Sequence, residues 1–279
     1  MTEKGERIAK VIAAAGICSR RDAERMIEQG RVRVNGNTLS SPALTVTPDD
    51  AIEVDGATLK KRKAAALPRL WRYHKPAGLI TSHHDPEGRP TVFEYLPPHL
   101  PRVISVGRLD LDSEGLLLLT DSGELSRALE LPRNAMDRTY RVRVNGQISE
   151  KHIHMLSRGV VVDEVKYRPI TVVPDTDKTS GRNRWLTVTL REGKNREIRR
   201  LFDYYGYPVS RLIRVGYAGI ELGDLAENGV AEVPAHTVEQ LLQALEDQAS
   251  VVPKRREPQR GGAQRNNEKR RGNKPPFKG

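Results

Sequence analysis

Hydrophobic and polar positions divide this chain into short strands and a few helices. Residues 138–144 alternate between polar and apolar, as in a strand with one buried face. The four leucines from Leu116 to Leu119 are continuous instead, and this pattern predicts a strand that is buried on both faces. Residues 210–217 predict a further strand of the same sheet.

The first 60 residues predict a smaller module. Residues 6–15 have helical spacing, and a second helix runs from Ser19, whose capping partner is Asp22, to Gly30. Two short alternating stretches follow, and each ends in a hairpin turn signal, Asn-Gly at 35–36 and Asp-Gly at 55–56.

Two more helices are expected in the second half of the chain. One begins at Gly193 or Asn195, has an apolar stripe and ends at Gly206, and the other covers residues 237–247. Together the elements predict an α+β fold, in which a small α/β module precedes a mixed, mostly antiparallel sheet with flanking helices.

Composition suggests three parts with different charge. Residues 1–66 form the small module and carry a net charge of +3, while residues 67–248 form the main domain. The segment 67–252 is neutral, and residues 253–279 carry +8 of the total of +11. A charged linker is expected at about 60–69, and a basic, disordered tail at 249–279. Positive charge at both ends favours a polyanionic partner, with nucleic acid as the first candidate.

The single cysteine, Cys18, excludes a disulfide framework and a thiolate metal cage. No apolar run approaches the roughly 18 residues that a membrane span needs. We therefore expect a cytoplasmic protein that does not enter a membrane. Adjacent His83, His84 and Asp85 lack the spaced partners of a metal site, so no metal is expected.

Charged residues that are candidates for a catalytic or binding site occur in two segments of the chain. Arg108 and Asp110 lie on a polar turn before the leucine strand, and an aspartate so close to a core needs a partner or a purpose. The alternative is an ordinary turn aspartate bonded to its own backbone. Residues 191–202 hold five cations within a neutral domain. These cations could instead be a solvated helix face.

Resemblance decides between these alternatives. Gly107-Arg-Leu-Asp110, followed by Ser113-x-Gly115-Leu-Leu, resembles the catalytic signature of RNA pseudouridine synthases, in the branch typified by the ribosomal small-subunit enzyme. Residues 191–202 resemble that family's glycine-basic loop and helix. Residues 19–24 and 30–36 resemble the S4-type RNA-binding domain. The resemblance extends to about residue 248.

The resemblance implies a role for each residue type. Asp110 is then the catalytic aspartate, Tyr140 stacks on the target base and can accept the C5 proton, and Arg199 pairs with Asp110. No cofactor takes part. The residues expected to contact RNA are Arg20, Arg21, Arg25, Arg108, Lys194 and Arg196.

The expected substrate is ribosomal RNA, free or in a pre-ribosomal particle. Residues 85–93 and 209–215 look most like large-subunit enzymes, which favours 23S rRNA over the small-subunit 16S rRNA. A monomer is expected. Two alternatives remain open, a non-catalytic RNA-binding ribosome assembly factor and a metal-dependent nuclease. The intact set of Asp110, Tyr140 and Arg199 favours the enzyme over the pure binder.

Overall fold

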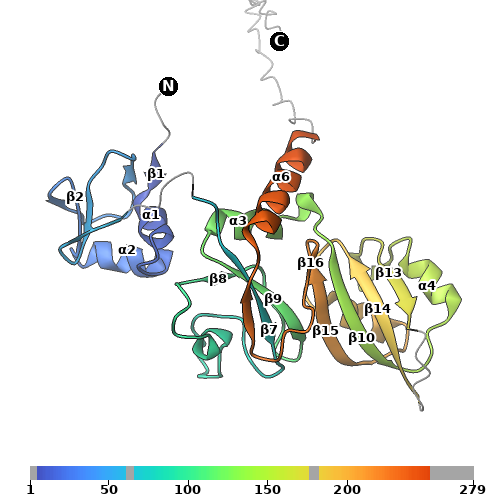
Figure 1. Ribbon diagram of the computed structural model, residues 1–279. Helices are drawn as coiled ribbons and strands as arrows, with labels where there is room; N and C mark the ends of the chain where they lie inside the picture. The colour runs from blue at the N-terminus through green and yellow to red at the C-terminus, as the bar shows by residue number, and fades with distance from the viewer. Residues whose placement is uncertain (1–4, 61–65, 176–181, 252–279) are drawn as a thin grey trace, which may run out of the picture.

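The computed structural model describes residues 5–60, 66–175 and 182–251, which form a small N-terminal module and a larger sheet domain (Figure 1). In the small module, a four-stranded sheet has the order β3-β2-β5-β6, and β1 pairs with β4. Its elements are β1 (Glu6–Arg7), α1 (Ile8–Ala14), α2 (Arg20–Glu28), β2 (Val32–Val34), β3 (Asn37–Thr38), β4 (Thr45–Val46), β5 (Ile52–Val54) and β6 (Ala57–Thr58).

Local sequence signals explain the small module well. The Ser19 side chain accepts a hydrogen bond from the Asp22 backbone N–H at 3.1 Å, which confirms the predicted cap of α2. Both predicted hairpin turns are present, and Asn35 and Asp55 have φ values of +50° and +51°. Helix α1 starts at Ile8, later than predicted, because Glu6 and Arg7 pair with β4 instead.

The larger domain contains a nine-stranded sheet with the order β13-β14-β10-β15-β9-β7-β17, while β16 pairs with β15 and β8 with β9. Within the described ranges all its pairings are antiparallel except that of β9 with β15. The strands are β7 (Leu70–Lys75), β8 (Ile104–Ser105), β9 (Glu114–Thr120), β10 (Arg138–Asn145), β13 (Thr171–Pro174), β14 (Asn183–Leu190), β15 (Val209–Tyr217), β16 (Ile220–Glu221) and β17 (Val230–Glu232). The predicted mixed, mostly antiparallel sheet is confirmed.

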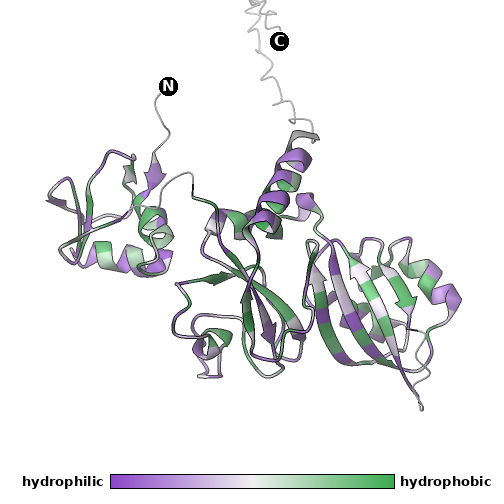
Figure 2. Ribbon diagram, in the orientation of Figure 1, coloured by the Kyte–Doolittle hydropathy of each residue, from purple (hydrophilic) through white to green (hydrophobic). Residues whose placement is uncertain are grey.

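Helices and loops cover this sheet from different sides. The helices are α3 (Gly123–Glu130), α4 (Glu150–Leu156), α5 (Glu197–Tyr204) and α6 (Ala235–Val251); a small hairpin is made by β11 (Val161–Val162) and β12 (Val165–Lys166), and the 3-10 turns are η1 (Val92–Tyr95) and η2 (Pro132–Asn134). Helices α3 and α6 pack beside β7 and β9, while α4 and α5 pack against β10 and β14. Figure 2 shows how hydrophobic and hydrophilic positions alternate along β10.

The central strand β9 is buried on both faces, as its continuous leucines predict. All four leucines are fully buried. Leu116 and Leu118 pack with α3 and α6, whereas Leu117 and Leu119 pack with Trp71, Tyr73 and the loops before β9. The turn that precedes β9 is therefore attached to a strand that is packed on both faces.

Two boundaries differ from the prediction. Helix α5 starts at Glu197, after the glycine-basic loop, and α6 continues to Val251, past the predicted start of the tail. The remaining tail residues, and residues 61–65 of the predicted linker, lie outside the described residues. No helix in the described parts of the chain is both long and apolar enough to cross a membrane.

Candidate active site

The turn before β9 holds Asp110 in a fixed backbone. The Asp110 carbonyl accepts a hydrogen bond from the Ser113 N–H at 3.1 Å, which closes the turn. The preceding residue, Leu109, is buried, and its N–H and C=O both bond to the Thr81 hydroxyl. The backbone is thus held on both sides of Asp110, while the Asp110 side chain remains 38 % exposed.

A buried lysine completes this support. Lys75, at the end of β7, is fully buried, and its ammonium donates to the carbonyls of Pro76, Asp110 and Ser113 at 3.0, 3.1 and 2.8 Å. Burial lowers the pKa of Lys75 to about 8, against the opposing effect of Asp112 and Asp110. Sequence reasoning missed this residue. The signal is its inward register, since Trp71, Tyr73 and Lys75 alternate along β7 and all three are buried.

The glycine-basic loop brings two arginines to the same turn. Arg196 lies just before α5 with a φ of +51°, a backbone conformation that L-residues adopt rarely. Its guanidinium donates to both carboxylate oxygens of Asp112, each at 3.1 Å, and lies 3.7 Å from Oδ2 of Asp110.

The expected ion pair between Arg199 and Asp110 is not found among the described contacts. Arg199 is 9 % exposed, and its guanidinium donates to the carbonyls of Asp112 and Val209 at 2.9 and 3.1 Å. It also lies 3.3 Å from Oδ2 of Asp112. The prediction that Arg199 pairs with Asp110 was therefore wrong in this geometry, because Arg199 lies on the buried side of α5, whereas Arg196 precedes the helix and reaches Asp110.

Asp112 is thus the centre of the charge cluster. Burial tends to raise its pKa, but the hydrogen bonds from Arg196 and the charge of Arg199 outweigh this effect, so the pKa of Asp112 is lowered. Both of its carboxylate oxygens are occupied by guanidinium groups. Asp110, by contrast, has only the 3.7 Å ion pair with Arg196 within the described residues.

Sheet register brings Tyr140 to this region. On adjacent strands, Tyr140 of β10 pairs with Arg214 of β15, which in turn pairs with Gly115 of β9. Two strand spacings separate Tyr140 from Gly115, or about 10 Å. The half-buried Tyr140 ring packs against the cluster that contains Leu109, the neighbour of Asp110.

Two buried glutamates hold the glycine-basic loop. Glu192 accepts hydrogen bonds from the Arg168 N–H at 2.6 Å and from the Lys194 ammonium, and Glu197 accepts from the Lys194 N–H at 3.0 Å. Burial, reinforced by the nearby charge of Glu192, raises the pKa of Glu197 to about 7. Lys194, expected to contact RNA, is already partly engaged in this loop. Neither glutamate was singled out from the sequence, although both lie within the basic motif at residues 191–202.

The other predicted RNA-contacting residues lie on the surface. Arg20, Arg21 and Arg25 are all exposed on α2, and Arg25 forms an ion pair with Asp22. Arg108 is exposed on the aspartate turn and has no ion pair in the described parts of the chain. These positions leave the arginines accessible to a polyanion.

Comparison with known proteins places the chain among its relatives. Residues 69–204 match the family model for RNA pseudouridylate synthase, and residues 6–52 match that for the S4 domain. A crystal structure of a pseudouridylate synthase shares the fold, with a TM-score of 0.59 at 24 % identity over 85 % of this chain and 99 % of that one.

Sequence relatives are considerably more similar. An uncharacterized RNA pseudouridine synthase from Rickettsia felis is 47 % identical over 82 % of this chain and 96 % of its own length. The ribosomal large subunit pseudouridine synthase B of Yersinia pestis is 41 % identical over 90 % of this chain and 79 % of its own length. The chain is therefore an isomerase with an S4 domain, and it belongs to the RNA pseudouridylate synthase family.

Proposed function

We propose that this protein converts one uridine of 23S ribosomal RNA to pseudouridine, with Asp110 as the reacting carboxylate. The choice of RNA is supported by similarity to enzymes named for the large ribosomal subunit, from Yersinia pestis, Pseudomonas aeruginosa and Salmonella typhimurium. The S4 domain and the exposed arginines of α2 supply an RNA-binding surface next to the catalytic domain.

The observation that carries the assignment of Asp110 is the contrast with Asp112 on the same turn. Two arginines occupy Asp112, so its carboxylate is committed to holding α5 and β9 together. The Asp110 carboxylate accepts no hydrogen bond within the described residues and is partly open to solvent. A group that must reach a substrate needs this freedom, and its rigid backbone fixes where it acts.

The reaction exchanges one bond to the ribose for another. The bond between N1 of uracil and C1′ breaks, the base turns, C5 bonds to C1′ and loses its proton, and N1 takes up a proton. Asp110 either attacks C1′ or removes a ribose proton to give a glycal, and both routes use the same carboxylate. Tyr140 stacks on the base and is the candidate acceptor of the C5 proton. A uridine inside a duplex must first be unstacked to reach this site.

Pseudouridine mapping at single-nucleotide resolution tests the proposal. In ribosomal RNA from cells that lack the protein, we expect one 23S position to lose its pseudouridine and to regain it when the wild-type gene is restored. A 16S position that changes instead would assign the protein to the small subunit. If no position changes, the RNA-binding assembly factor becomes the better explanation.

Substitution of Lys75 by methionine should slow the reaction more than it weakens RNA binding. The change removes three hydrogen bonds, two of them to the aspartate turn, and a misplacement of about 1 Å can lower a rate about 10²-fold. Single-turnover rates at saturating RNA measure the effect, with Lys151→Met on the exposed face of α4 as the control. An unchanged rate in the Lys75 variant would show that the turn does not depend on this ammonium.

A further inference from the structure

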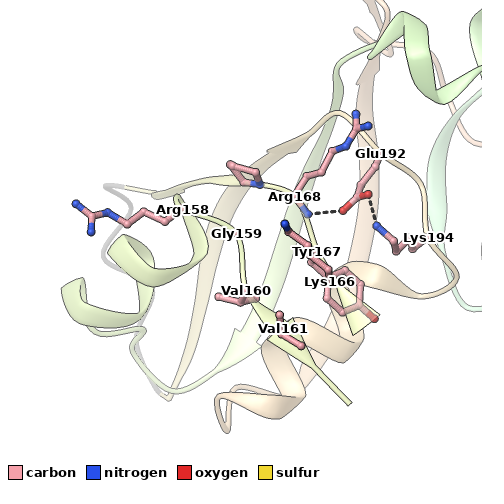
Figure 3. Close-up of a pocket in the computed structure, with 10 residues that line it drawn as sticks. Arg158, Gly159, Val160, Val161, Lys166, Tyr167, Arg168, Glu192 and Lys194 are labelled. Atoms are coloured by element: carbon pink, nitrogen blue, oxygen red, sulfur yellow. Dashed lines mark hydrogen bonds and ion pairs between the residues drawn. The ribbon is translucent and has the colours of Figure 1, made fainter. Parts of the chain in front are cut away.

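A second concave site lies beside the glycine-basic loop. It has a volume of about 400 Å³, within the roughly 300–1,000 Å³ that small-molecule sites occupy. Its walls come from the segment after α4, the β11–β12 hairpin and the start of the glycine-basic loop. Figure 3 shows Glu192 and Lys194 at one end of this pocket and Arg158 at the opposite end. We call it the hairpin pocket.

Three cations at the hairpin pocket have no carboxylate partner within the described ranges. Arg158, Lys166 and Arg168 are exposed, and none forms an ion pair within the described ranges. Lys194 lines the pocket as well, with its ammonium 5.4 Å from the centre of the Tyr167 ring. Segment 67–252 is neutral overall, so three unpaired cations around one concavity form a local site for phosphate groups.

The interior of the hairpin pocket suits a base and not a phosphate. Glu192, which is 8 % exposed, contributes a carboxylate that repels a phosphate from the interior. Val161 is 61 % exposed at the pocket and offers an apolar surface on which a base can pack. A nucleotide therefore fits with its base inward and its phosphates on the surrounding cations.

The hairpin pocket is also close to the catalytic turn. Lys194 lines it, and Arg196, two residues further along the same loop, contacts Asp110 and Asp112. The Cα atoms of Lys194 and Arg196 lie at most about 7 Å apart. Their side chains lengthen the path from the pocket to Asp110, so an RNA strand whose target uridine lies at Asp110 would reach the pocket with a nucleotide a few positions away.

We propose that the hairpin pocket binds an unpaired nucleotide that flanks the target uridine, with its base against Val161 and Glu192 and its phosphates on Arg158 and Arg168. This site rests on the proposed function, and it adds a means of selecting the target. An RNA that lacks an unpaired nucleotide at the right spacing loses these contacts, even where its uridine is accessible.

Binding as a function of salt tests the phosphate contacts. The probe is a synthetic stem-loop that surrounds the uridine found by mapping, and the variant combines Arg158→Gln with Arg168→Gln. For single-stranded RNA, each lost phosphate contact makes the slope of log K against log salt less steep by about 0.7. Loss of both contacts should therefore reduce the steepness by about 1.4 and weaken binding about tenfold at 0.15 M salt.

Arg127→Gln with Arg133→Gln is the matched control, because both arginines are exposed and have no ion pair in the described part of the chain. It removes the same charge from the region of α3 and η2. If the control pair and the pocket pair weaken binding equally, the effect is general electrostatic attraction and the proposal is wrong.

Base removal tests which nucleotide occupies the hairpin pocket. Abasic residues are placed in turn at each unpaired position of the stem-loop, and Kd is measured with wild type and with Val161→Ser. At one position, the abasic residue should weaken binding to the wild type by at least about threefold more than it weakens binding to the Val161→Ser variant. The reason is that the missing base and the missing valine side chain remove the same contact. Val173→Ser is the control, because Val173 is 54 % exposed on β13 and does not line the pocket.

The two proposals fail in different ways. If the wild-type protein neither binds nor converts the stem-loop, the proposed function fails, and the flanking-nucleotide site with it. If the stem-loop is converted but no abasic position couples to Val161, the function stands and the hairpin pocket has no role in recognition.

Discussion

Replacement of Asp110 by asparagine is expected to abolish pseudouridine formation while RNA binding remains intact. The amide has nearly the same shape, but it can neither attack C1′ nor remove a ribose proton. Loss of the reacting group should lower the single-turnover rate by roughly 10³-fold or more. Fold stability should change little, because the Asp110 side chain is partly exposed and accepts no hydrogen bond within the described residues.

Asp112→Asn is the informative comparison for Asp110→Asn. That change weakens the ion pairs with Arg196 and Arg199, so we expect a lower unfolding temperature and a partial loss of rate. If Asp112→Asn abolishes the reaction and Asp110→Asn does not, the two carboxylates have been assigned the wrong way round. Release of tritium from [5-³H]uridine in the stem-loop measures the reaction directly.

Gly115→Ala is expected to destabilise the sheet more than any other substitution considered above. A Cβ at Gly115 would lie 2.2 Å from the carbonyl oxygen and 2.8 Å from the nitrogen of Arg214, on the neighbouring strand β15. Both are backbone atoms of a central strand, so the clash can be relieved only by separating β9 from β15. We expect a loss of more than about 4 kcal/mol of unfolding free energy, measured by urea denaturation.

Gly219→Ala separates this clash from backbone strain. Gly219, between β15 and β16, also has a positive φ, +79°, but an added Cβ would meet nothing within 4 Å. It should lose only about 1–2 kcal/mol, the usual penalty for a left-handed L-residue. Similar losses in the two variants would show that φ, and not the approach of β15, explains the need for glycine at Gly115.

Much of the fold could be predicted from local sequence, because local pattern determined those elements. The leucines of β9 are buried on both faces, Ser19 caps α2, and Asn35 and Asp55 occupy the positive-φ positions of their hairpins. The parallel pairing of β9 with β15 could not be predicted, since it joins segments far apart in the chain.

The supports of the site were harder to predict than its motif. Lys75 was missed because a lysine in an alternating strand is usually exposed, whereas three carbonyls make its burial possible. From the helical spacing we predicted that α5 begins at Gly193 or Asn195. The helix starts at Glu197 instead, so Arg196 lies outside it and contacts Asp110. Arg199 lies inside the helix and contacts Asp112.

The parallel pairing of β9 with β15 also bears on when the candidate active site can form during synthesis of the chain. Arg199 reaches the Asp112 carbonyl across 87 positions of the chain, and Arg214 reaches the Leu116 carbonyl across 98. Contacts of such high sequence separation form late and slowly in folding. At roughly 5–20 residues per second, a nascent chain carries Asp110 for several seconds before the residues that complete its surroundings are made. Until β15 docks beside β9, the aspartate turn lacks its contact with Arg199, so we expect a fragment that ends before β15 not to modify RNA.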